Sequence, residues 1–438
     1  MDQDPLQQAF AHHSAGRLEA AALSYRAVLA RDPDHTEANH LLGVIRFQQG
    51  HTGEARTHLA RATAAAAATA EMHNNFGVVL NALGESEAAA AAFSRALGLN
   101  PDYAEACNNL GSIHRIAGRI EMAVQCFRQA LALKPDYAEA QENLRAAYRD
   151  VIPAWHFAMM NDEIRNRAYD EAIGRAAPGK RVLDIGTGAG LLAMMAARAG
   201  AQQVTTVEMV SLIAERARDI VAANNLSDRI RVIGKPSSEL LVGQDLVERA
   251  EVLVTETFSS GLLNEGVLPT LEHAHEHLLL PGAAIIPAAA SAMGYLAGGD
   301  MLRQKLFIDR AAGLDLGLFN DFAPPKVGLY LDREPHEILS EDMELIRFDL
   351  AQRRFPMGSR RVTIKATRSG VAVGIAQWLM LELDAETRYA NRPSPDAGSN
   401  GWTHILYRFP HPVTVKPGDF IRLVVRHDRA QISIDLVE

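Results

Sequence analysis

Residues 181–190 combine an aspartate with closely spaced glycines, a pattern that can bind a nucleoside. Asp184 lies in a short apolar run and is followed within four positions by Gly186, Thr187 and Gly188. Such a run closed by glycines predicts a buried parallel strand that turns tightly into a helix. Glycine lets the backbone approach a bound molecule, and the helix start behind it offers unpaired N–H groups. The stretch therefore predicts a ligand cradle.

The spacing of the glycines indicates which ligand the cradle accepts. A dinucleotide fingerprint has its third glycine where this chain has Leu191, and here that glycine stands at Gly190 instead. A second apolar run, 203–207, ends at Glu208, and an acid at that strand tip suits the two hydroxyl groups of a ribose. We therefore favour S-adenosylmethionine over a nicotinamide nucleotide, with Ser237 placed to meet the adenine edge. The alternative is an ordinary strand-to-helix turn of an α/β domain.

Two glutamates flank a loop further along the chain. Glu256 ends the apolar run 252–255, and Glu265 follows nine positions later, beyond a loop that contains Gly261. If the loop brings the two carboxylates together, they repel each other and hold a proton or a cation between them. A planar, forked guanidinium is the cation that such a pair binds best. The pair therefore predicts a site for a guanidinium group.

Strands and helices alternate around these candidate residues. Alternation predicts a parallel, doubly wound sheet whose ligands bind at the carboxyl ends of the strands. The predicted strands are 182–185, 203–207, 230–233 and 252–255, and the predicted helices are 155–173, 191–199 and 211–224. Beyond about Pro287, short alternating runs separated by Pro and Gly predict an antiparallel barrel or sandwich. These runs are 361–366, 374–383, 404–409 and 420–425.

A fixed period of 34 residues organises the first 150 positions. The period carries glycines at two points of the repeat, Gly16, Gly50, Gly84 and Gly118, and Gly43, Gly77 and Gly111. A period of this length is typical of stacked helix pairs, in which small residues permit close approach of the helices. Residues 4 to about 148 closely resemble tetratricopeptide repeats, although the second unit has Ala67 in place of a proline. A binding module is therefore expected.

Asparagines keep the same period and are candidates for partner binding. Asn75, Asn109 and Asn143 each precede a Leu or Phe of a predicted first helix. Similar repeat proteins turn this position toward the concave groove, where an amide can bond an extended peptide backbone. Local capping or a solvated surface is the alternative interpretation.

Residues 155–438 resemble the protein arginine methyltransferases, most closely the larger branch whose members carry two such modules in one chain. The double-glutamate loop of that family maps onto Glu256 and Glu265, and its donor loop onto 184–190. Its amino-terminal motif, Met-x-x-Asp-x-x-Arg, maps onto Met159, Asp162 and Arg165. The resemblance implies that Arg165 holds the methionine carboxylate of the donor. From the spacing alone, Asp162 and Arg165 share a helical face and a surface ion pair would explain them.

The Thr-His-Trp loop of the same family maps onto Thr403, His404 and Ile405, so this chain lacks the tryptophan. The resemblance implies that His404, paired with Asp162, closes the substrate pocket. The neighbouring Trp402 is a candidate substitute for the missing ring, but a shift of one residue on a strand points the side chain to the other face.

Composition and charge limit the classes of partner. The formal net charge of −9 argues against a nucleic-acid partner and weakly favours a cationic one. The chain has two cysteines, which indicates neither a disulfide framework nor a thiolate metal site. The first residues lack a signal-peptide pattern and no apolar run approaches ~18 residues, so we expect a cytoplasmic protein that does not enter the membrane. His273, His275 and His277 lack the acidic partner of a zinc motif, so we expect helix packing and no metal.

These observations predict three domains. They are a tetratricopeptide-repeat solenoid at 1–150, a Rossmann-like methyltransferase domain at 151–287 and a β-barrel domain at 288–438. An apolar, helical segment at about 301–325 is, by the resemblance, an arm that embraces a second subunit and implies a homodimer.

The expected function is transfer of methyl from S-adenosylmethionine to arginine in a protein or peptide, with the repeats recruiting the substrate. Methylation of a small cationic metabolite is one alternative. A repeat scaffold with an idle catalytic module is the other.

Overall fold

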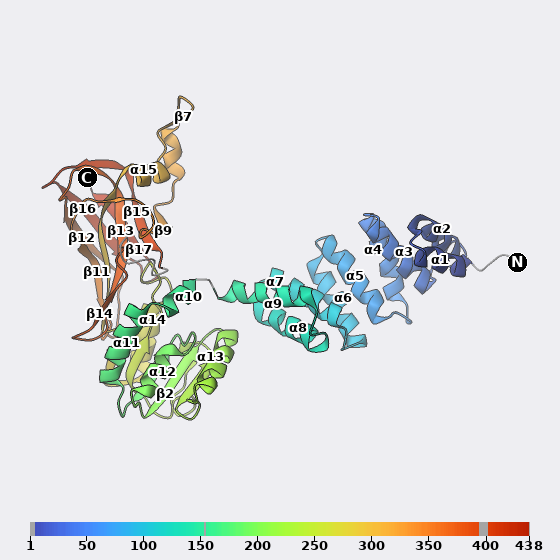
Figure 1. Cartoon of the computed structure of the whole chain (residues 1–438), viewed down its shortest axis with the longest axis horizontal. Coiled ribbons are helices and arrows are strands. Elements are labelled where there is room, and N and C mark those ends of the chain that lie inside the picture. The colour runs from blue at the N-terminus through green and yellow to red at the C-terminus, as the bar shows by residue number, and fades with distance from the viewer. Residues whose placement is uncertain (1–4, 153–154, 394–401, 438) are drawn as a thin grey trace. The chain divides into compact units, whose positions relative to one another are not determined.

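The structure is a computed structural model that describes residues 5–152, 155–393 and 402–437. The chain forms two compact units, Met1–Ala154 and Trp155–Glu438 (Figure 1). The further boundary expected at 287/288 stays a prediction. None of the helices in the described ranges is long and apolar enough to cross a membrane.

The first unit is a series of antiparallel helices. They are α1 (Pro5–Ser14), α2 (Leu18–Leu29), α3 (Thr36–Gln48), α4 (Thr52–Ala64), α5 (Ala70–Ala82), α6 (Ser86–Leu99), α7 (Ala104–Ile116), α8 (Ile120–Leu133) and α9 (Ala138–Val151). Gly84, between α5 and α6, has φ +77°, a left-handed conformation that glycine adopts without strain. Inside α5, a Cβ atom on Gly77 would lie 2.5 Å from the Phe93 ring. The periodic glycines therefore serve two purposes, the turn within a repeat and close packing of its two helices.

The second unit begins with a helix that is broken in two. The sequence predicts one helix over 155–173, but the structure has α10 (Trp155–Met160) and α11 (Glu163–Ala176). Asp162 causes the break, because its backbone is extended and its carboxylate accepts a hydrogen bond from the Arg165 amide at 2.9 Å. The predicted surface ion pair between these two residues is wrong, since Asp162 caps the helix and Arg165 is buried.

A five-stranded parallel sheet follows, with strand order β3-β2-β1-β4-β5. Its strands are β1 (Arg181–Ile185), β2 (Gln203–Glu208), β3 (Ile230–Gly234), β4 (Ala250–Thr255) and β5 (Leu279–Ile286). The connecting helices are α12 (Leu191–Arg198), α13 (Ser211–Ala223), the 3₁₀ turn η1 (Ser237–Glu239) and α14 (Val267–His273), which continues as a π-helical turn, η2 (Ala274–Leu278). β1 is central and pairs in parallel with β2 and β4, so their carboxyl ends meet at one edge. This arrangement confirms the doubly wound sheet.

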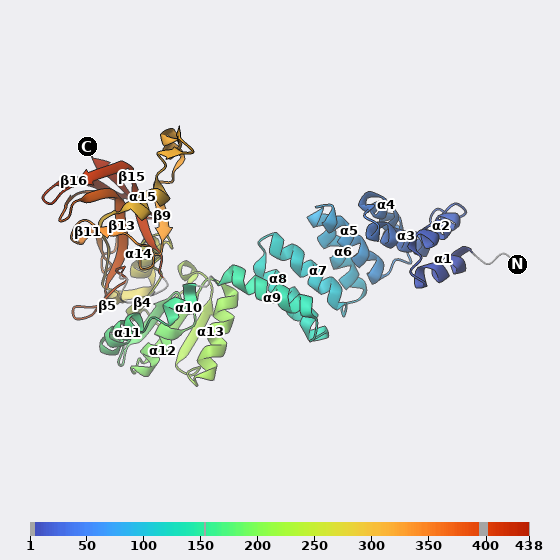
Figure 2. The same cartoon turned by 45° about the horizontal axis from the view of Figure 1, so that its top comes forward.

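Antiparallel sheets form the rest of the second unit (Figure 2). The larger sheet contains β6 (Ala289–Gly298), β9 (Lys326–Leu329), β10 (Glu337–Ile338), β11 (Met343–Asp349), β13 (Gly370–Glu382), β14 (Arg388–Ala390) and β15 (His404–Val415). The smaller sheet has the order β12-β16-β17, with β12 (Gly358–Lys365), β16 (Phe420–His427) and β17 (Ile432–Val437). One continuous apolar core joins the parallel sheet to these strands, from Val254 and Ile286 to Leu379 and Leu423. The two parts of the unit are therefore held in a fixed relation at their contact.

The predicted helical arm is only partly helical. It contains a short helix, α15 (Asp300–Leu306), then β7 (Arg310–Ala311), β8 (Leu314–Asp315) and a 3₁₀ turn, η3 (Gly317–Phe322). Figures 1 and 2 both show the segment around β7 projecting away from the sheets. Glycines and aspartates interrupt the apolar run at regular intervals, which explains why a continuous helix does not form.

Candidate active site

The glycine-rich turn after β1 adopts a conformation suited to binding a ligand. Gly186 has φ +91° and Gly188 has φ +51°, and Gly190, with φ +83°, precedes α12. A Cβ atom on Gly186 would lie 2.8 Å from the side chain of Thr257, so only glycine fits at that position. The amides of Gly186 and Thr187 bond the Val207 carbonyl, so the turn is held against β2, and a Cβ atom on Gly188 would meet nothing within 4 Å.

Asp184 lies behind this turn and is fully buried. The Thr206 hydroxyl donates to its Oδ2 at 2.7 Å, and the Thr187 hydroxyl is 2.5 Å from that of Thr206. Burial raises the pKa of Asp184 to about 7, although the Thr206 hydrogen bond opposes the shift. The other oxygen, Oδ1, is buried without a hydrogen-bond partner. A buried polar atom of this kind normally has a partner, so a donor from a ligand fits there.

Glu208 closes the turn from the end of β2. Its carboxylate accepts hydrogen bonds from the amides of Gly188 at 3.2 Å and Val210 at 3.0 Å. A carboxylate has about four acceptor sites, so two backbone donors leave capacity for ribose hydroxyls. Ser237 begins η1 directly after β3, at the same edge of the sheet, and is half-buried. Its contact with an adenine stays a prediction.

Glu256 and Arg165 form a buried ion pair. The Arg165 Nη2 lies 3.0 Å from the Glu256 Oε2, and the side chains are only 4% and 6% exposed. Burial raises the pKa of Glu256, and the charges of Glu265 and Asp162 raise it further against the opposing effect of Arg165. The Nε of Arg165 and the Oε1 of Glu256 are buried without partners. Glu256 therefore already holds one guanidinium, and one oxygen remains for a second.

Glu265 lines a cavity of about 280 Å³. The protein around Glu265 and the charge of Glu208 raise the pKa of its carboxyl, although the side chain remains exposed. Glu256 does not line the cavity but lies close enough for the two charges to interact. The lining residues are Met159, Phe258, Ser259, Ser260, Gly261, Asn264, Glu265, Tyr330, Trp402, Thr403 and Ile405. Walls that combine aromatic, apolar and polar side chains with one acid suit a long side chain that ends in a cation.

The predicted pairing of His404 with Asp162 is wrong. His404 is buried, and its Nε2 bonds the Asn391 carbonyl at 2.8 Å. Thr403 and Ile405 line the cavity on either side of His404 in the sequence, so His404 points to the opposite face of its strand. Burial lowers the pKa of His404, in keeping with a neutral ring inside the core.

Tyr389, and not His404, is the residue that bonds Asp162. Its hydroxyl donates to the Asp162 Oδ2 at 2.6 Å, and the side chain is buried. Burial and the Asp162 carboxylate raise the pKa of Tyr389, so the hydroxyl stays protonated and remains a donor. Tyr389 lies 227 positions from Asp162, and its type and spacing give no signal of this contact.

Trp402 forms an aromatic wall of the cavity, whereas strand alternation predicted that its side chain would point away from the site. It lines the cavity together with Ile405. The argument from strand alternation fails because β15 begins only at His404, so Trp402 lies outside the regular strand. Trp402 thus contributes an aromatic ring to the same cavity that Ile405 lines, three positions further along the chain.

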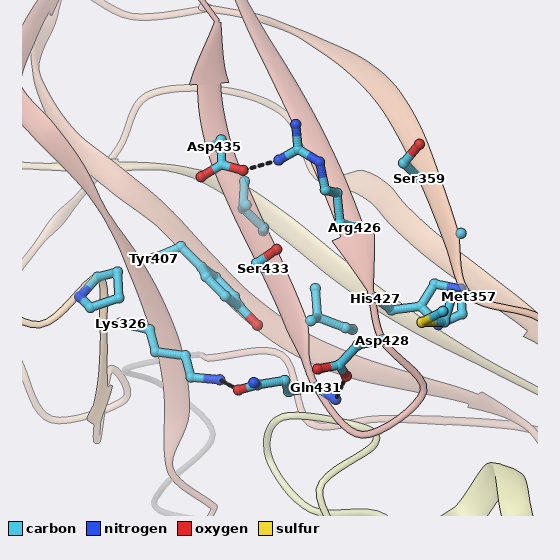
Figure 3. Close-up of a pocket in the computed structure, with 14 residues that line it drawn as sticks. Lys326, Met357, Ser359, Tyr407, Arg426, His427, Asp428, Gln431, Ser433 and Asp435 are labelled. Atoms are coloured by element: carbon cyan, nitrogen blue, oxygen red, sulfur yellow. Dashed lines mark hydrogen bonds and ion pairs between the residues drawn. The ribbon is translucent and has the colours of Figure 1, made fainter.

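A larger cavity of about 700 Å³ lies elsewhere on the antiparallel sheets (Figure 3). Its walls come from β9, β12, β15, β16 and β17, where Lys326 bonds Gln431 and Arg426 bonds Asp435. Among its lining residues in the described ranges, none is a predicted catalytic or donor-binding residue. The smaller cavity is the candidate site because it alone adjoins the acidic loop.

The periodic asparagines form a ladder between repeats. Asn109 donates to the Asn74 side chain at 3.0 Å, and Asn143 donates to that of Asn108 at 2.9 Å. Asn75 occupies the same place and bonds the His40 ring at 3.0 Å. All three are half-buried, and the Asn143 amide also donates to the Ser112 hydroxyl at 3.4 Å, so the amide nitrogens bond inside the solenoid while the amide oxygens can accept from a partner. Their role in partner binding stays a prediction.

The three clustered histidines pack in the second unit. His275 bonds the Leu350 carbonyl at 2.9 Å, and the rings of His273 and His277 are 4.8 Å apart. In the described part of the chain, no group of three or more His, Cys, Asp or Glu residues is arranged to hold a metal ion.

The donor-site residues fit S-adenosylmethionine. The unpartnered Asp184 Oδ1 suits the methionine amino group, and the unpartnered Arg165 Nε suits its carboxylate. Glu208 is placed for the ribose hydroxyls at the carboxyl end of β2.

Comparisons with known protein families divide the chain in the same way. Tetratricopeptide-repeat families match residues 12–74, 70–103 and 104–137. The family described as ribosomal protein L11 methyltransferase (PrmA) matches 167–264, which covers the glycine-rich turn and the acidic loop up to the residue before Glu265.

Solved structures of two arginine methyltransferases have the same fold as the second unit. One is the Trypanosoma brucei PRMT1 enzyme-prozyme heterotetrameric complex with AdoHcy, with a TM-score of 0.56, 21% identity, and coverage of 66% of this chain and 95% of that one. The other is Arabidopsis thaliana protein arginine methyltransferase 10, with a TM-score of 0.54, 20% identity, and coverage of 64% and 91%.

Sequence relatives extend this likeness. An arginine N(omega)-methyltransferase of Streptomyces achromogenes subsp. streptozoticus is 41% identical over 274 residues, which span 62% of this chain and 75% of that protein. Protein arginine N-methyltransferase 7 of Danio rerio is 31% identical over 310 residues, 64% of this chain but 45% of that protein. The chain thus spans less than half of that longer relative. Behind its tetratricopeptide repeats, the chain belongs to the arginine N-methyltransferase family.

Proposed function

We propose that this chain methylates a guanidinium nitrogen of arginine in a protein or peptide, with S-adenosylmethionine as the donor. The observation that carries the proposal is the acidic loop. Glu256 binds a guanidinium, that of Arg165, at one end of the loop, and Glu265 stands at the other end beside an aromatic cavity. An arginine in this cavity would meet Glu265 on the wall, and its guanidinium would have to reach past the wall to bond the unpartnered Oε1 of Glu256.

The residues suggest how the reaction proceeds. Bound S-adenosylmethionine supplies a methyl group on a positively charged sulfur. Glu256 and Glu265 hold the guanidinium by hydrogen bonds and draw its positive charge toward themselves, which leaves one nitrogen free to attack. Holding that nitrogen in line with the donor supplies much of the rate. The raised pKa of both carboxyls makes them better acceptors for the proton that the guanidinium must lose.

The test is Glu256→Gln, assayed with a methyl-labelled donor and an arginine peptide. We expect kcat to fall at least about a thousandfold, while the donor Kd measured by calorimetry changes only a few fold. Glu248→Gln is the control, because Glu248 is 66% exposed and pairs only at the surface with Arg181. Wild-type activity in Glu256→Gln would remove the proposed role of the acidic loop. Absence of donor binding in the wild-type chain would favour the idle scaffold.

A second candidate substrate is free arginine. The relative from Streptomyces, at 41% identity, is named for arginine without the word protein. Parallel assays with free arginine, arginine peptides and lysate protein distinguish the two substrates. A kcat/KM for free arginine above that for every peptide and protein would establish the small-molecule function.

We infer that the repeats recruit a protein substrate through the asparagine ladder. The amide nitrogens bond inside the solenoid, and the amide oxygens recur at the spacing of the repeats, where they can accept hydrogen bonds from an extended peptide. Asn75, Asn109 and Asn143, changed together to Ala, should raise KM for a protein substrate at least about fivefold and leave free arginine unaffected. Equal KM values for the protein substrate, with the repeats still folded by circular dichroism, would contradict this role.

We also infer a homodimer built through the projecting arm, in a cytoplasmic protein. Leu318, Phe319 and Phe322 are 87%, 66% and 81% exposed, and such an apolar surface usually has a cover. The solved relative from Trypanosoma is a heterotetrameric complex. Phe319→Ser with Phe322→Ser should turn a dimer into a monomer in sedimentation equilibrium. A wild-type chain that sediments as a monomer would contradict the inference.

A further inference from the structure

The loop between Glu256 and Glu265 has little regular structure of its own. Leu262 in this loop has φ +69°, a left-handed conformation that costs a non-glycine residue about 1–2 kcal/mol. The amide of Leu262 bonds the Ser259 carbonyl at 2.8 Å, and the amide of Leu263 bonds the Gly261 carbonyl at 2.9 Å. A loop of tight turns with a strained residue keeps its shape only when contacts from outside hold it.

Apolar packing supplies some of those contacts, since Leu262 and Leu263 are fully buried in the main core. The polar contacts come from the antiparallel sheet and its edge and meet at Ser260, near the middle of the loop. Gln377, in the middle of β13, is fully buried and donates from Nε2 to the Ser260 carbonyl at 2.9 Å. The Tyr407 hydroxyl donates to the Oε1 of Gln377 at 3.0 Å. The side chain of Ser260 is also bonded, because its hydroxyl lies 3.0 Å from the hydroxyl of Thr403. Ser260 and Thr403 both line the candidate substrate cavity.

Gln377 is a polar residue inside an apolar strand, so its hydrogen bond to Ser260 calls for an explanation. Its neighbours Ile375 and Leu379 are fully or almost fully buried in the main core. Burying an amide in such a core is unfavourable unless its groups are hydrogen-bonded. Both groups of Gln377 are bonded, and the two bonds join Tyr407 of β15 to the acidic loop. The Tyr407 ring also borders the larger cavity (Figure 3).

We propose that Gln377 is a positioning residue for methyl transfer, which holds Ser260 and so sets where Glu256 and Glu265 stand relative to each other. This inference rests on the proposed function of the acidic loop. Gln377 does not touch the substrate. It acts through the loop, and Tyr407 acts through Gln377.

The first test is Gln377→Glu, compared with the wild type across the pH range. Burial at this position should raise the pKa of the introduced carboxyl, so that it is protonated at pH 6 and ionised at pH 9. A protonated glutamic acid can donate to the Ser260 carbonyl as the amide does, but an ionised one cannot and repels that oxygen. We expect kcat of the variant near the wild-type value at pH 6 and about ten- to hundredfold lower at pH 9, with the donor Kd unchanged. A residue that only stabilises the fold would lower the unfolding midpoint without this pH-dependent loss of kcat.

Two further variants keep the test decisive. Gln377→Met removes both hydrogen bonds at similar size and should lower kcat about tenfold at every pH. Tyr407→Phe removes one buried oxygen, so it decides the matter if the Gln377 variants do not fold. Ser340→Ala is the control, because Ser340 is a buried hydroxyl of the same unit that bonds Leu296 and Glu341 and not the loop.

The outcomes separate this inference from the proposed function. If the wild-type chain methylates arginine and kcat of folded Gln377→Met stays within about twofold, the positioning role is overturned. If the wild-type chain binds the donor but methylates no form of arginine, the proposed function itself fails. A loss of kcat in Gln377→Met, with Ser340→Ala active, supports the inference.

Discussion

The hydrogen bond from Tyr389 to Asp162 gives the sharpest test of how the donor site is held. Asp162 accepts the Tyr389 hydroxyl on Oδ2 at 2.6 Å and caps α11 through Oδ1, at the amide of Arg165. Arg165 in turn pairs with Glu256. Tyr389→Phe removes the hydroxyl and leaves the ring in place. Loss of this hydroxyl therefore affects the donor site through Asp162 and Arg165, at the start of α11.

The size of the effect follows from the type of bond. A hydrogen bond to a charged acceptor contributes about 1.5–3 kcal/mol, and water can replace part of it here because Asp162 is half-buried. We therefore expect Tyr389→Phe to lower the free energy of unfolding by about 1–2 kcal/mol. If about 1 kcal/mol of this reaches Arg165, the donor Kd rises about fivefold. Chemical denaturation and calorimetry with S-adenosylmethionine measure the two quantities.

Two comparisons make the result specific. Tyr295→Phe also removes a buried hydroxyl, one that bonds His336 at 2.8 Å, and should cost stability without changing the donor Kd. Asp162→Asn, combined with Tyr389→Phe in a double-mutant cycle, should show a coupling energy of about 1 kcal/mol. The reasoning is refuted if Tyr389→Phe binds the donor like the wild type while His404→Leu loses affinity. That result would restore the pairing of His404 with Asp162.

Three further predictions follow from buried groups and close contacts. The pKa of Asp184 is about 7 in the folded chain, whereas its ordinary value is 3.8. Between these two pH values the folded chain binds a proton that the unfolded chain has lost, so the free energy of unfolding falls as pH rises through this range. Asp184→Asn removes this dependence. In urea titrations the free energy of unfolding of the wild type should therefore fall by up to about 3 kcal/mol relative to that of the variant between pH 5 and 7 (2 pH units × 1.36 kcal/mol). Parallel curves of the free energy of unfolding against pH would contradict this. Gly77→Ala forces a methyl group to within 2.5 Å of the Phe93 ring and should destabilise the repeats by about 1–3 kcal/mol in thermal melts. Gly98→Ala meets nothing within 4 Å and should stabilise them by up to about 1 kcal/mol, so equal effects would disprove the packing argument. Trp402→Ala opens one wall of the cavity and should raise KM for the arginine substrate about tenfold with the donor Kd unchanged, whereas an unchanged KM would remove Trp402 from the site.

Features that depend on neighbouring residues could be predicted from the sequence. The strand, turn and helix around Gly186 and Gly188 follow from an apolar run, a strict need for glycine and a helical pattern. The repeats follow from their 34-residue period, because each helix pair packs only on its neighbours. The acidic loop was also visible, since Glu256 and Glu265 flank one short turn region.

Contacts between distant segments were decided by the tertiary structure alone. Tyr389 reaches Asp162 across 227 positions and Gln377 reaches Ser260 across 117, and neither residue belongs to a local pattern. Because β15 begins at His404, the His404 ring lies in the core, and Trp402, which precedes the strand, does not follow its alternation of side-chain directions. Sequence periodicity records which face of an element is apolar, but the partner of a polar side chain depends on how separate strands come together. The sequence therefore determined the types of groups in the donor and acceptor sites, and the packing of the sheets decided which side chains hold them in place.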